Sequence, residues 1–236
     1  MRGLFVTGTD TGVGKTVLSA ALVAAIAAQG EPVRAYKPVM TGLDELPDRR
    51  APCSWPADHE LLGATAGMAP EDVAPLRYGP AVSPHLAARL AGERIDAAGL
   101  LAGAHALAAG EAGALIVEGV GGLLAPLRED YAVRDLAVAL GLPLLIAARP
   151  GLGTINHTLL TLDAARAARL TVAAVVLSPW PPRPGTLERS NRETIAAVGA
   201  VEVAGLGPVA GPDPGELARA GGELPWRRWL GAGSTT

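Results

Sequence analysis

Cysteine and lysine are nearly absent from this 236-residue sequence, and it contains no long apolar run. Cys53 is the only cysteine, which excludes an intrachain disulfide and a metal site built from several thiolates. A single thiol fits a reducing compartment, so we expect a cytoplasmic protein. No apolar run approaches the ~18 residues of a membrane span, and Leu4–Val6 is too short for the core of a signal peptide. We therefore expect no membrane partner.

A basic surface is also missing. The formal net charge is −3, which argues against nucleic acid as a partner, because polyphosphate backbones are bound by extended basic faces. Small anionic ligands need only a local site and are compatible with this charge. The positive charge comes from 18 arginines and only two lysines, Lys15 and Lys37. Each lysine is either there by chance or occupies a position that needs a compact ammonium group instead of a planar guanidinium.

The composition is that of a folded protein. Hydrophobic residues make up 49% and charged residues 18% of the chain, a balance that can fill a large core. Proline- and glycine-rich stretches at 47–56, 178–185 and 205–215 do not separate independent core-sized patterns, so we interpret them as loops. We expect a single domain that spans residues 1–236.

Short unbroken apolar runs alternate with helix-like segments along the chain. The runs lack the in-and-out alternation of a half-exposed antiparallel sheet, which favours a buried parallel sheet. Right-handed crossovers then predict an α/β fold, doubly wound, with a mostly parallel sheet flanked by helices. The expected strands are Leu4–Thr7, Pro32–Lys37, Ala114–Glu118, Pro143–Ala147, Thr171–Leu177 and Val201–Leu206, and the expected helices are Lys15–Gln29, Pro84–Ala91, Ala97–Ala109, Asn156–Arg169 and Gly185–Ala197.

The strongest motif is Gly8-Thr9-Asp10-Thr11-Gly12-Val13-Gly14-Lys15-Thr16, which follows an expected strand and opens an expected helix. This is the context of a phosphate-binding P-loop, in which glycines let backbone N–H groups converge on an anion at a helix N-terminus. Lys15 would neutralise phosphate charge, and the Thr16 hydroxyl would bind magnesium. The first glycine of the usual pattern is displaced by one position, to Gly8, so the loop is a variant.

A P-loop needs a carboxylate partner for magnesium. Glu118 supplies one at the end of the apolar run Leu115–Val117, and the glycines that follow it let the backbone pass close to a ligand. The alternative is that Glu118 is an exposed charge at a strand end. Asp58 offers a second oxygen ligand, although on spacing alone it can equally be a helix N-cap.

Five segments, in order along the chain, carry a resemblance to a known family. They are Gly8–Thr16, Tyr36–Gly42, Ser83–Ala88, Val117–Gly122 and Gly153–Thr158. Together they resemble the dethiobiotin synthetases, from residue 4 to about residue 210. The Thr-Asp-Thr form of the loop, followed by a Lys-Pro element, is far more specific than a P-loop alone, and it accounts for the displaced glycine.

The resemblance implies a P-loop NTPase fold, a homodimer and a reaction. Enzymes of this family convert 7,8-diaminononanoate, carbon dioxide and ATP, with Mg²⁺, to dethiobiotin, ADP and phosphate. One substrate amine captures carbon dioxide as a carbamate, the carbamate takes the γ-phosphoryl group, and the second amine closes the ring. This chemistry requires no nucleophilic side chain, only positioning and charge neutralisation.

The resemblance also assigns residues to roles. Lys15, Lys37 and Thr11 are implied as catalytic, and Thr41 would lie near the diamine, although both threonines can alternatively cap turns. The implied magnesium ligands are Thr16, Asp58 and Glu118. The implied nucleotide contacts are Gly12, Val13, Gly14, Lys15, Thr16, Val17, Asp58, Glu118, Gly119, Val120, Gly121, Ser178, Pro179, Pro208, Val209 and Ala210.

The segment from Gly151 to Asn156 resembles the part of the family that receives the substrate carboxylate across the dimer interface, which suits a helix N-terminus. Ser83-Pro84 reads as a helix start, and whether Ser83 or His85 touches substrate stays open. His157 has no nameable role in the chemistry. The four histidines are too dispersed in sequence to indicate a metal cluster.

The chain departs from the family at one position. The family has an asparagine after the strand that ends at Leu177, where its amide reads the adenine edge, and this chain has Ser178. A serine cannot make the paired donor and acceptor contacts of an amide, so nucleotides other than ATP enter as candidate co-substrates. The Trp180 ring would either stack on the base of the nucleotide or pack against its own loop.

Two other classes of protein share this core. A dimeric regulatory or partitioning P-loop ATPase carries an additional lysine early in its loop, where this chain has Asp10. An amidase of the cobyrinate type needs a further glutaminase domain with a catalytic cysteine, and from the length of the sequence we expect no such domain.

Overall fold

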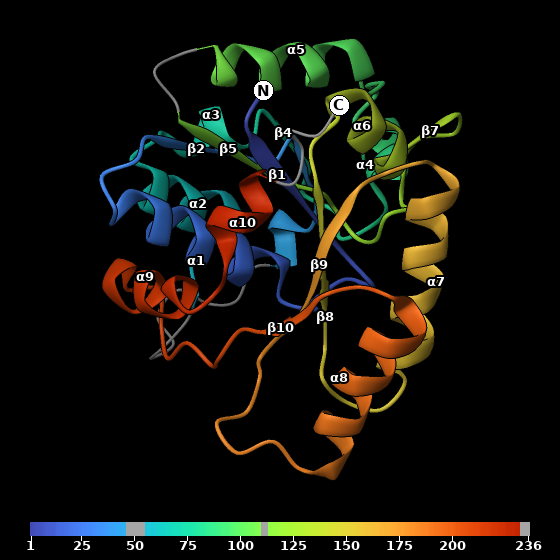
Figure 1. Cartoon of the computed structure of the whole chain (residues 1–236). Helices are drawn as coiled ribbons and strands as arrows, with labels where there is room; N and C mark the ends of the chain where they lie inside the picture. Colours follow the sequence, from blue (N-terminus) through green and yellow to red (C-terminus); the bar gives the residue numbers. More distant parts are fainter. Residues whose placement is uncertain (46–54, 110–112, 232–236) are drawn as a thin grey trace.

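The computed structural model of the chain describes residues 1–45, 55–109 and 113–231. Cys53 lies outside these ranges, as does most of the expected loop 47–56. A six-stranded sheet runs through the centre of the molecule, with helices on both faces (Figure 1). All its strand pairs are parallel, and the spatial order is β10 (Val203–Gly205), β9 (Val172–Leu177), β8 (Leu144–Ala148), β1 (Gly3–Gly8), β5 (Ala114–Glu118) and β2 (Val33–Tyr36).

The central strands are buried along their whole length. Every residue of β1, β5 and β8 is buried, because helices cover both faces of the sheet, and this accounts for the unbroken apolar runs. Val6 pairs with Glu118 in the register of β1 and β5, so the two strands end at the same edge of the sheet. The fold therefore places Glu118 beside the loop that leaves β1, and it confirms the predicted doubly wound α/β architecture.

Two hydrophobic clusters, one on each face of the sheet, define the helical layers. Side chains alternate between them along a strand: Leu4 and Val6 belong to one cluster and Phe5 to the other. The first layer holds α1 (Lys15–Ala27), α2 (Asp58–Ala66), α3 (Pro70–Val73), α9 (Pro214–Gly222) and α10 (Trp226–Gly231). The second layer holds α4 (Pro84–Leu90), α5 (Ala97–Ala108), α6 (Val133–Leu140), α7 (Thr154–Ala167) and α8 (Thr186–Gly199).

Short elements complete the described part of the chain. A 3₁₀ turn, η1, spans Leu43–Glu45, a parallel pair joins β3 (Val39–Met40) to β4 (Leu76–Arg77), and an antiparallel pair joins β6 (Pro126–Arg128) to β7 (Tyr131–Ala132). Within the described ranges, no helix is long and apolar enough to cross a membrane.

Several expected boundaries differ from the structure. The first helix ends at Ala27 instead of Gln29, and the helix expected from Asn156 begins earlier, at Thr154. The expected loop 205–215 was wrong at its end, because Pro214 already starts α9 and the Asp213 carboxylate caps that helix. The sequence prediction also omitted α6, which follows β7 directly and has Ala132 at its N-cap, so the usual polar start signal is absent.

Gly221 sets the close packing of α9 on α1. A Cβ atom at this position would lie 2.0 Å from the carbonyl oxygen of Ala21, whereas Gly222 has nothing within 4 Å. We expect Gly221→Ala to lower the free energy of unfolding by about 1–3 kcal/mol, because the helices must move apart. Gly222→Ala is the matched control and should change the free energy of unfolding little. Urea denaturation of the two variants measures the difference, and equal stabilities would contradict the packing argument.

Candidate nucleotide and metal site

The loop between β1 and α1 has the conformation that anion binding requires. Gly12 and Gly14 have φ angles of 68° and 93°, in the left-handed region that favours glycine. Gly14 is the N-cap of α1 and supplies no side-chain cap, so the first N–H groups of the helix are left for a ligand. Gly8 is tightly enclosed, since a Cβ there would lie 2.8 Å from Val13. Close packing therefore explains why the displaced position of the motif holds a glycine.

Polar contacts hold the loop in this shape. The backbone N–H of Thr11 donates to the Asp10 carboxylate at 2.7 Å, and the Lys15 ammonium donates to the Asp10 carbonyl at 2.9 Å. Arg149, which directly follows β8, donates to the carbonyl oxygens of Thr11 and Gly12 from outside the loop. No role for Arg149 could be predicted from the sequence, because this residue belongs to no recognised motif.

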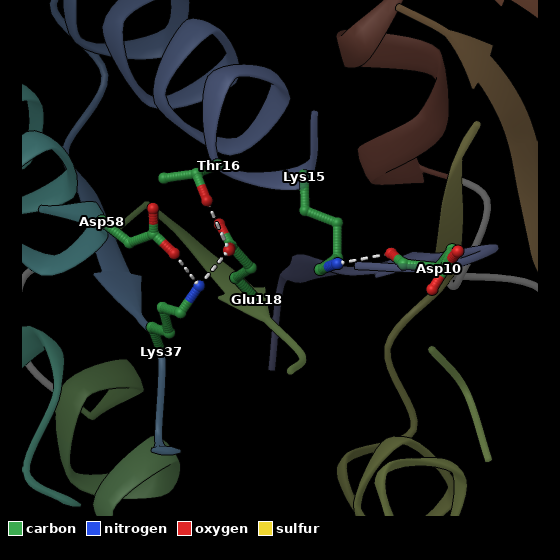
Figure 2. Close-up of polar contacts among 6 residues, drawn as sticks. All are labelled: Asp10, Lys15, Thr16, Lys37, Asp58 and Glu118. Carbon is green, nitrogen blue, oxygen red and sulfur yellow. Dashed lines mark hydrogen bonds and ion pairs between the residues drawn. The ribbon is translucent and has the colours of Figure 1, made fainter. Parts of the chain in front are cut away.

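Four side chains from four elements meet beside the loop (Figure 2). Nζ of Lys37, just after β2, lies 2.5 Å from Oδ2 of Asp58 and 2.6 Å from Oε1 of Glu118. The Thr16 hydroxyl donates to the same Glu118 oxygen at 2.9 Å. Asp58 opens α2, Glu118 closes β5 and Thr16 lies in the first turn of α1. The structure thus brings together residues far apart in sequence that were predicted to share one site.

Burial and charge set the protonation of this cluster. Burial alone would lower the pKa of Lys37, but the charges of Glu118 and Asp58 and their hydrogen bonds reverse the effect and raise it. Burial works to raise the pKa of Asp58, and the Lys37 ammonium outweighs it, so that this pKa is lowered. Burial also lowers the pKa of Lys15, which the charge of Glu118 partly offsets. Lys37 therefore stays protonated in this cluster.

The oxygen atoms of this cluster fit a hard divalent cation. Oε2 of Glu118 is buried and has no hydrogen-bond partner among the described residues, so one carboxylate oxygen is left for a further ligand. A threonine hydroxyl and two carboxylates are donors that Mg²⁺ accepts. The N-cap interpretation of Asp58 was wrong: Ala57 occupies that position, its N–H is bonded by Glu60, and Asp58 is the first helical residue. The described ranges contain no group of three or more histidine, cysteine, aspartate or glutamate side chains suited to a metal.

A cavity of about 770 Å³ opens next to this cluster. Two predicted substrate-side hydroxyls, Thr11 and Thr41, line it together with Lys15, Lys37 and Asp58. Ser83 and Pro84, at the start of α4, also line the cavity and were left out of the predicted set, although the motif Ser83–Ala88 had singled them out. The remaining lining residues are Gly12, Gly14, Thr16, Val17, Met40, Ala81, Val82, Val120, Gly121, Gly122 and Ala125.

Other predicted residues lie outside this cavity. Asn156 is exposed in the first turn of α7, and Gly151 lies in the turn before that helix. Val13 and Gly119 are buried against neighbouring residues. His85 lines a separate cavity with Arg89 and Arg128.

The predicted base-binding residues lie outside the cavity lining, and one of them, Ser178, lies next to the loop. Ser178 is buried against the P-loop, and its Oγ would lie 3.3 Å from a Cβ at Gly14. Pro179, Pro208 and Ala210 are exposed, and Val209 packs partly on the first core cluster. The Trp180 ring covers Gly205 and lies under the Arg192 guanidinium, which favours the packing interpretation over base stacking.

Comparison with known proteins gives one consistent family. A family model described as an AAA domain matches residues 2–210. The chain is 42% identical to the ATP-dependent dethiobiotin synthetase BioD of Anaeromyxobacter dehalogenans strain 2CP-1 over 226 residues, which cover 95% of this chain and 97% of the relative. It is 46% identical to BioD of Anaeromyxobacter sp. strain Fw109-5 over 180 residues, or 75% and 77% of the two chains.

A solved structure shares the fold at low sequence identity. The cobyrinic acid a,c-diamide synthase of Mycobacterium smegmatis, with an ATP analogue and magnesium, superimposes with a TM-score of 0.51 at 17% identity, over 94% of this chain and 92% of that one. At this identity the likeness concerns the fold alone.

Proposed function

The chain belongs to the ATP-dependent dethiobiotin synthetase family, and we propose that the cavity beside its P-loop is where the ureido ring of dethiobiotin is closed. The protein is an ATP-dependent cyclo-ligase of biotin biosynthesis, with 7,8-diaminononanoate and carbon dioxide as the other substrates. The observation that carries the site is that Lys15, Thr16, Lys37, Asp58 and Thr41 line one cavity.

The polar side chains in and beside the cavity divide the tasks of this reaction among them. The N–H groups around Gly14, with Lys15, bind the triphosphate, and Thr11 and Thr41 supply hydroxyls that orient the diamine and its carbamate. Lys37 balances the negative charge that builds up on the carbamate and the transferred phosphoryl group. The carbamate oxygen takes the γ-phosphoryl group of ATP and ADP leaves. The second amine then attacks the carbon of this mixed anhydride, the C–O bond breaks, and phosphate and the amine proton leave. Thr16, Asp58 and Glu118 would hold Mg²⁺, which neutralises phosphate charge when bound.

A homodimer with shared sites accounts for the residues that lie outside the cavity. Leu152 is 92% exposed in the turn before α7, and Leu124 and Leu160 are 57% and 59% exposed. Apolar side chains this exposed favour an interface with a second copy. In that arrangement Gly151 and Asn156 reach the substrate bound to the partner, with the carboxylate at the N-terminus of α7. Light scattering tests this, and a monomeric mass at working concentration would contradict it.

The test of the function is product formation. The protein is incubated with diaminononanoate, bicarbonate, Mg²⁺ and ATP, and dethiobiotin is detected by mass spectrometry. We expect product that depends on all four components. Nucleotide binding without any product would refute the enzymatic function. The result would instead favour the regulatory P-loop ATPase.

We expect ATP, GTP and CTP to support turnover with efficiencies within roughly a hundredfold of one another, because one hydrogen-bonding contact is worth about 1–3 kcal/mol. Ser178 faces the P-loop, and the prolines around the base site carry no side-chain donor. The measurement is kcat/KM for each nucleotide at fixed Mg²⁺ and diamine. Ser178→Ala should leave the ratios unchanged. A larger preference for ATP would show that backbone groups near Pro208 read the base.

A further inference from the structure

Lys37 lies between the two carboxylates that are proposed to bind the metal. Its ammonium nitrogen is 2.5 Å from Asp58 and 2.6 Å from Glu118, and only 5% of its side chain is exposed. The Glu118 side chain is 1% exposed, so water does little to weaken that contact. A single cation therefore bridges the two carboxylates of the proposed metal site (Figure 2).

A divalent cation needs the same two carboxylates. Oε1 of Glu118 already accepts both the ammonium and the Thr16 hydroxyl, so a metal bound by Thr16 and Glu118 would face the positive charge of Lys37 at close range. Even where the metal takes the other oxygen of Glu118, two cations on one buried carboxylate repel each other strongly. Building on the proposed function, we infer that Lys37 is an exchangeable internal cation, which competes with the metal for Asp58 and Glu118 and swings toward the reacting oxygens when the metal displaces it.

The surroundings of Lys37 permit this exchange. Lysine has a flexible four-carbon stem, and the Lys37 side chain borders the cavity of about 770 Å³ that also contains Thr11 and Thr41. The displaced ammonium thus has a place to go that is part of the substrate site. Within the part of the chain that the structure describes, the second oxygen of Glu118 is buried without a partner, so a divalent cation can bind there and then repel the ammonium.

The exchange couples two catalytic cations. Because coupling between two ligands of one site is reciprocal, the lysine weakens metal binding by the same factor as the metal weakens the lysine contacts. Lys37 would then be delivered to the carbamate only in the metal-loaded enzyme. In the resting enzyme it would screen two carboxylates that otherwise repel each other.

Metal binding to the nucleotide-free protein tests the exchange. Mn²⁺ is titrated into the wild type and Lys37→Met, and free Mn²⁺ is followed by electron paramagnetic resonance, with Mg²⁺ as competitor. We expect Lys37→Met to bind Mn²⁺ about five- to 150-fold more tightly than the wild type, the usual range of coupling between sites. Lys15→Met is the matched control: Lys15 donates to the Asp10 carbonyl and not to these carboxylates, so its removal should raise affinity much less.

Thermal melting shows whether the Lys37→Met variant is folded. We expect Lys37→Met to melt lower than the wild type in EDTA, because two carboxylates lose their shared cation, and to recover when Mg²⁺ is added. The chain has only two lysines, so ¹³C-lysine spectra of the wild type resolve Lys37 directly. Its signal should shift with the same Mg²⁺ dependence as metal binding.

The outcomes separate the inference from the proposed site. If Lys37→Met and the wild type bind Mn²⁺ equally while Glu118→Gln binds none, the metal site stands and the exchange is wrong. An equal gain in Lys37→Met and Lys15→Met would also overturn it, since a general loss of charge would then suffice. If no variant binds metal without nucleotide, the exchange fails and the metal site loses its independent support.

Discussion

Lys37→Arg is expected to lower kcat for ring closure by about 10²–10³-fold, the usual cost of losing one placed donor in an active site. The reason is geometric. The ammonium sits between Asp58 and Glu118 with both contacts near 2.6 Å or shorter, in a site that leaves it almost no exposure. A planar guanidinium is larger and spreads its donors over a fork, so it cannot place one compact charge between carbamate and phosphoryl oxygens.

Measuring ATP binding distinguishes a specific loss of catalysis from a general disruption of the site. Lys37 does not belong to the P-loop, so the dissociation constant for ATP should change only a few-fold in Lys37→Arg. The only other lysine gives the matched contrast, since Lys15→Arg should weaken nucleotide binding itself. Single-turnover ring closure and equilibrium binding measure the two quantities. Wild-type turnover in Lys37→Arg would refute the assigned role.

The fold could be predicted because its signals are local and repeated. Unbroken apolar runs such as Ala114–Glu118 appear in sequence as they appear in the sheet, since strands buried on both faces need no alternation. Two of the helices that were missed, α6 and α9, were missed for different reasons. The α6 helix starts without a polar N-cap, and α9 follows a proline- and glycine-rich stretch that reads as a loop until Pro214.

The candidate site was predictable in its residues but not in its geometry. The P-loop and Glu118 follow from motif and strand position, whereas Asp58 was ambiguous on spacing and depended on the family resemblance. Nothing in the sequence indicates that Lys37 bridges the two carboxylates, because that contact depends on how β2, α2 and β5 pack. The contact of Arg149 with the P-loop could not be predicted for the same reason, because it too depends on tertiary packing.

Glu118→Gln is expected to reduce Mg²⁺-dependent turnover by about 10²-fold or more, a loss of the size seen when a placed charge or donor is removed. Glutamine keeps the size of the side chain and can still accept the Thr16 hydroxyl, so the backbone at the end of β5 need not move. It lacks the anionic oxygen that a hard cation requires, and its amide group offers Lys37 no charge.

The decisive comparison for Glu118→Gln is between two binding measurements. Nucleotide binding without Mg²⁺ should change little, because it depends on Lys15 and the N–H groups of the P-loop, while the Mg²⁺ concentration for half-maximal turnover should rise. Asp130→Asn is the matched control: it removes the same charge from an exposed carboxylate that pairs with Arg128 outside the cavity, and its Mg²⁺ dependence should stay that of the wild type. Parallel losses of Mg²⁺-free binding and of turnover in Glu118→Gln would instead indicate a collapsed loop. Because Glu118 is almost fully buried and one of its oxygens has no partner in the described ranges, the structure favours the metal-specific result.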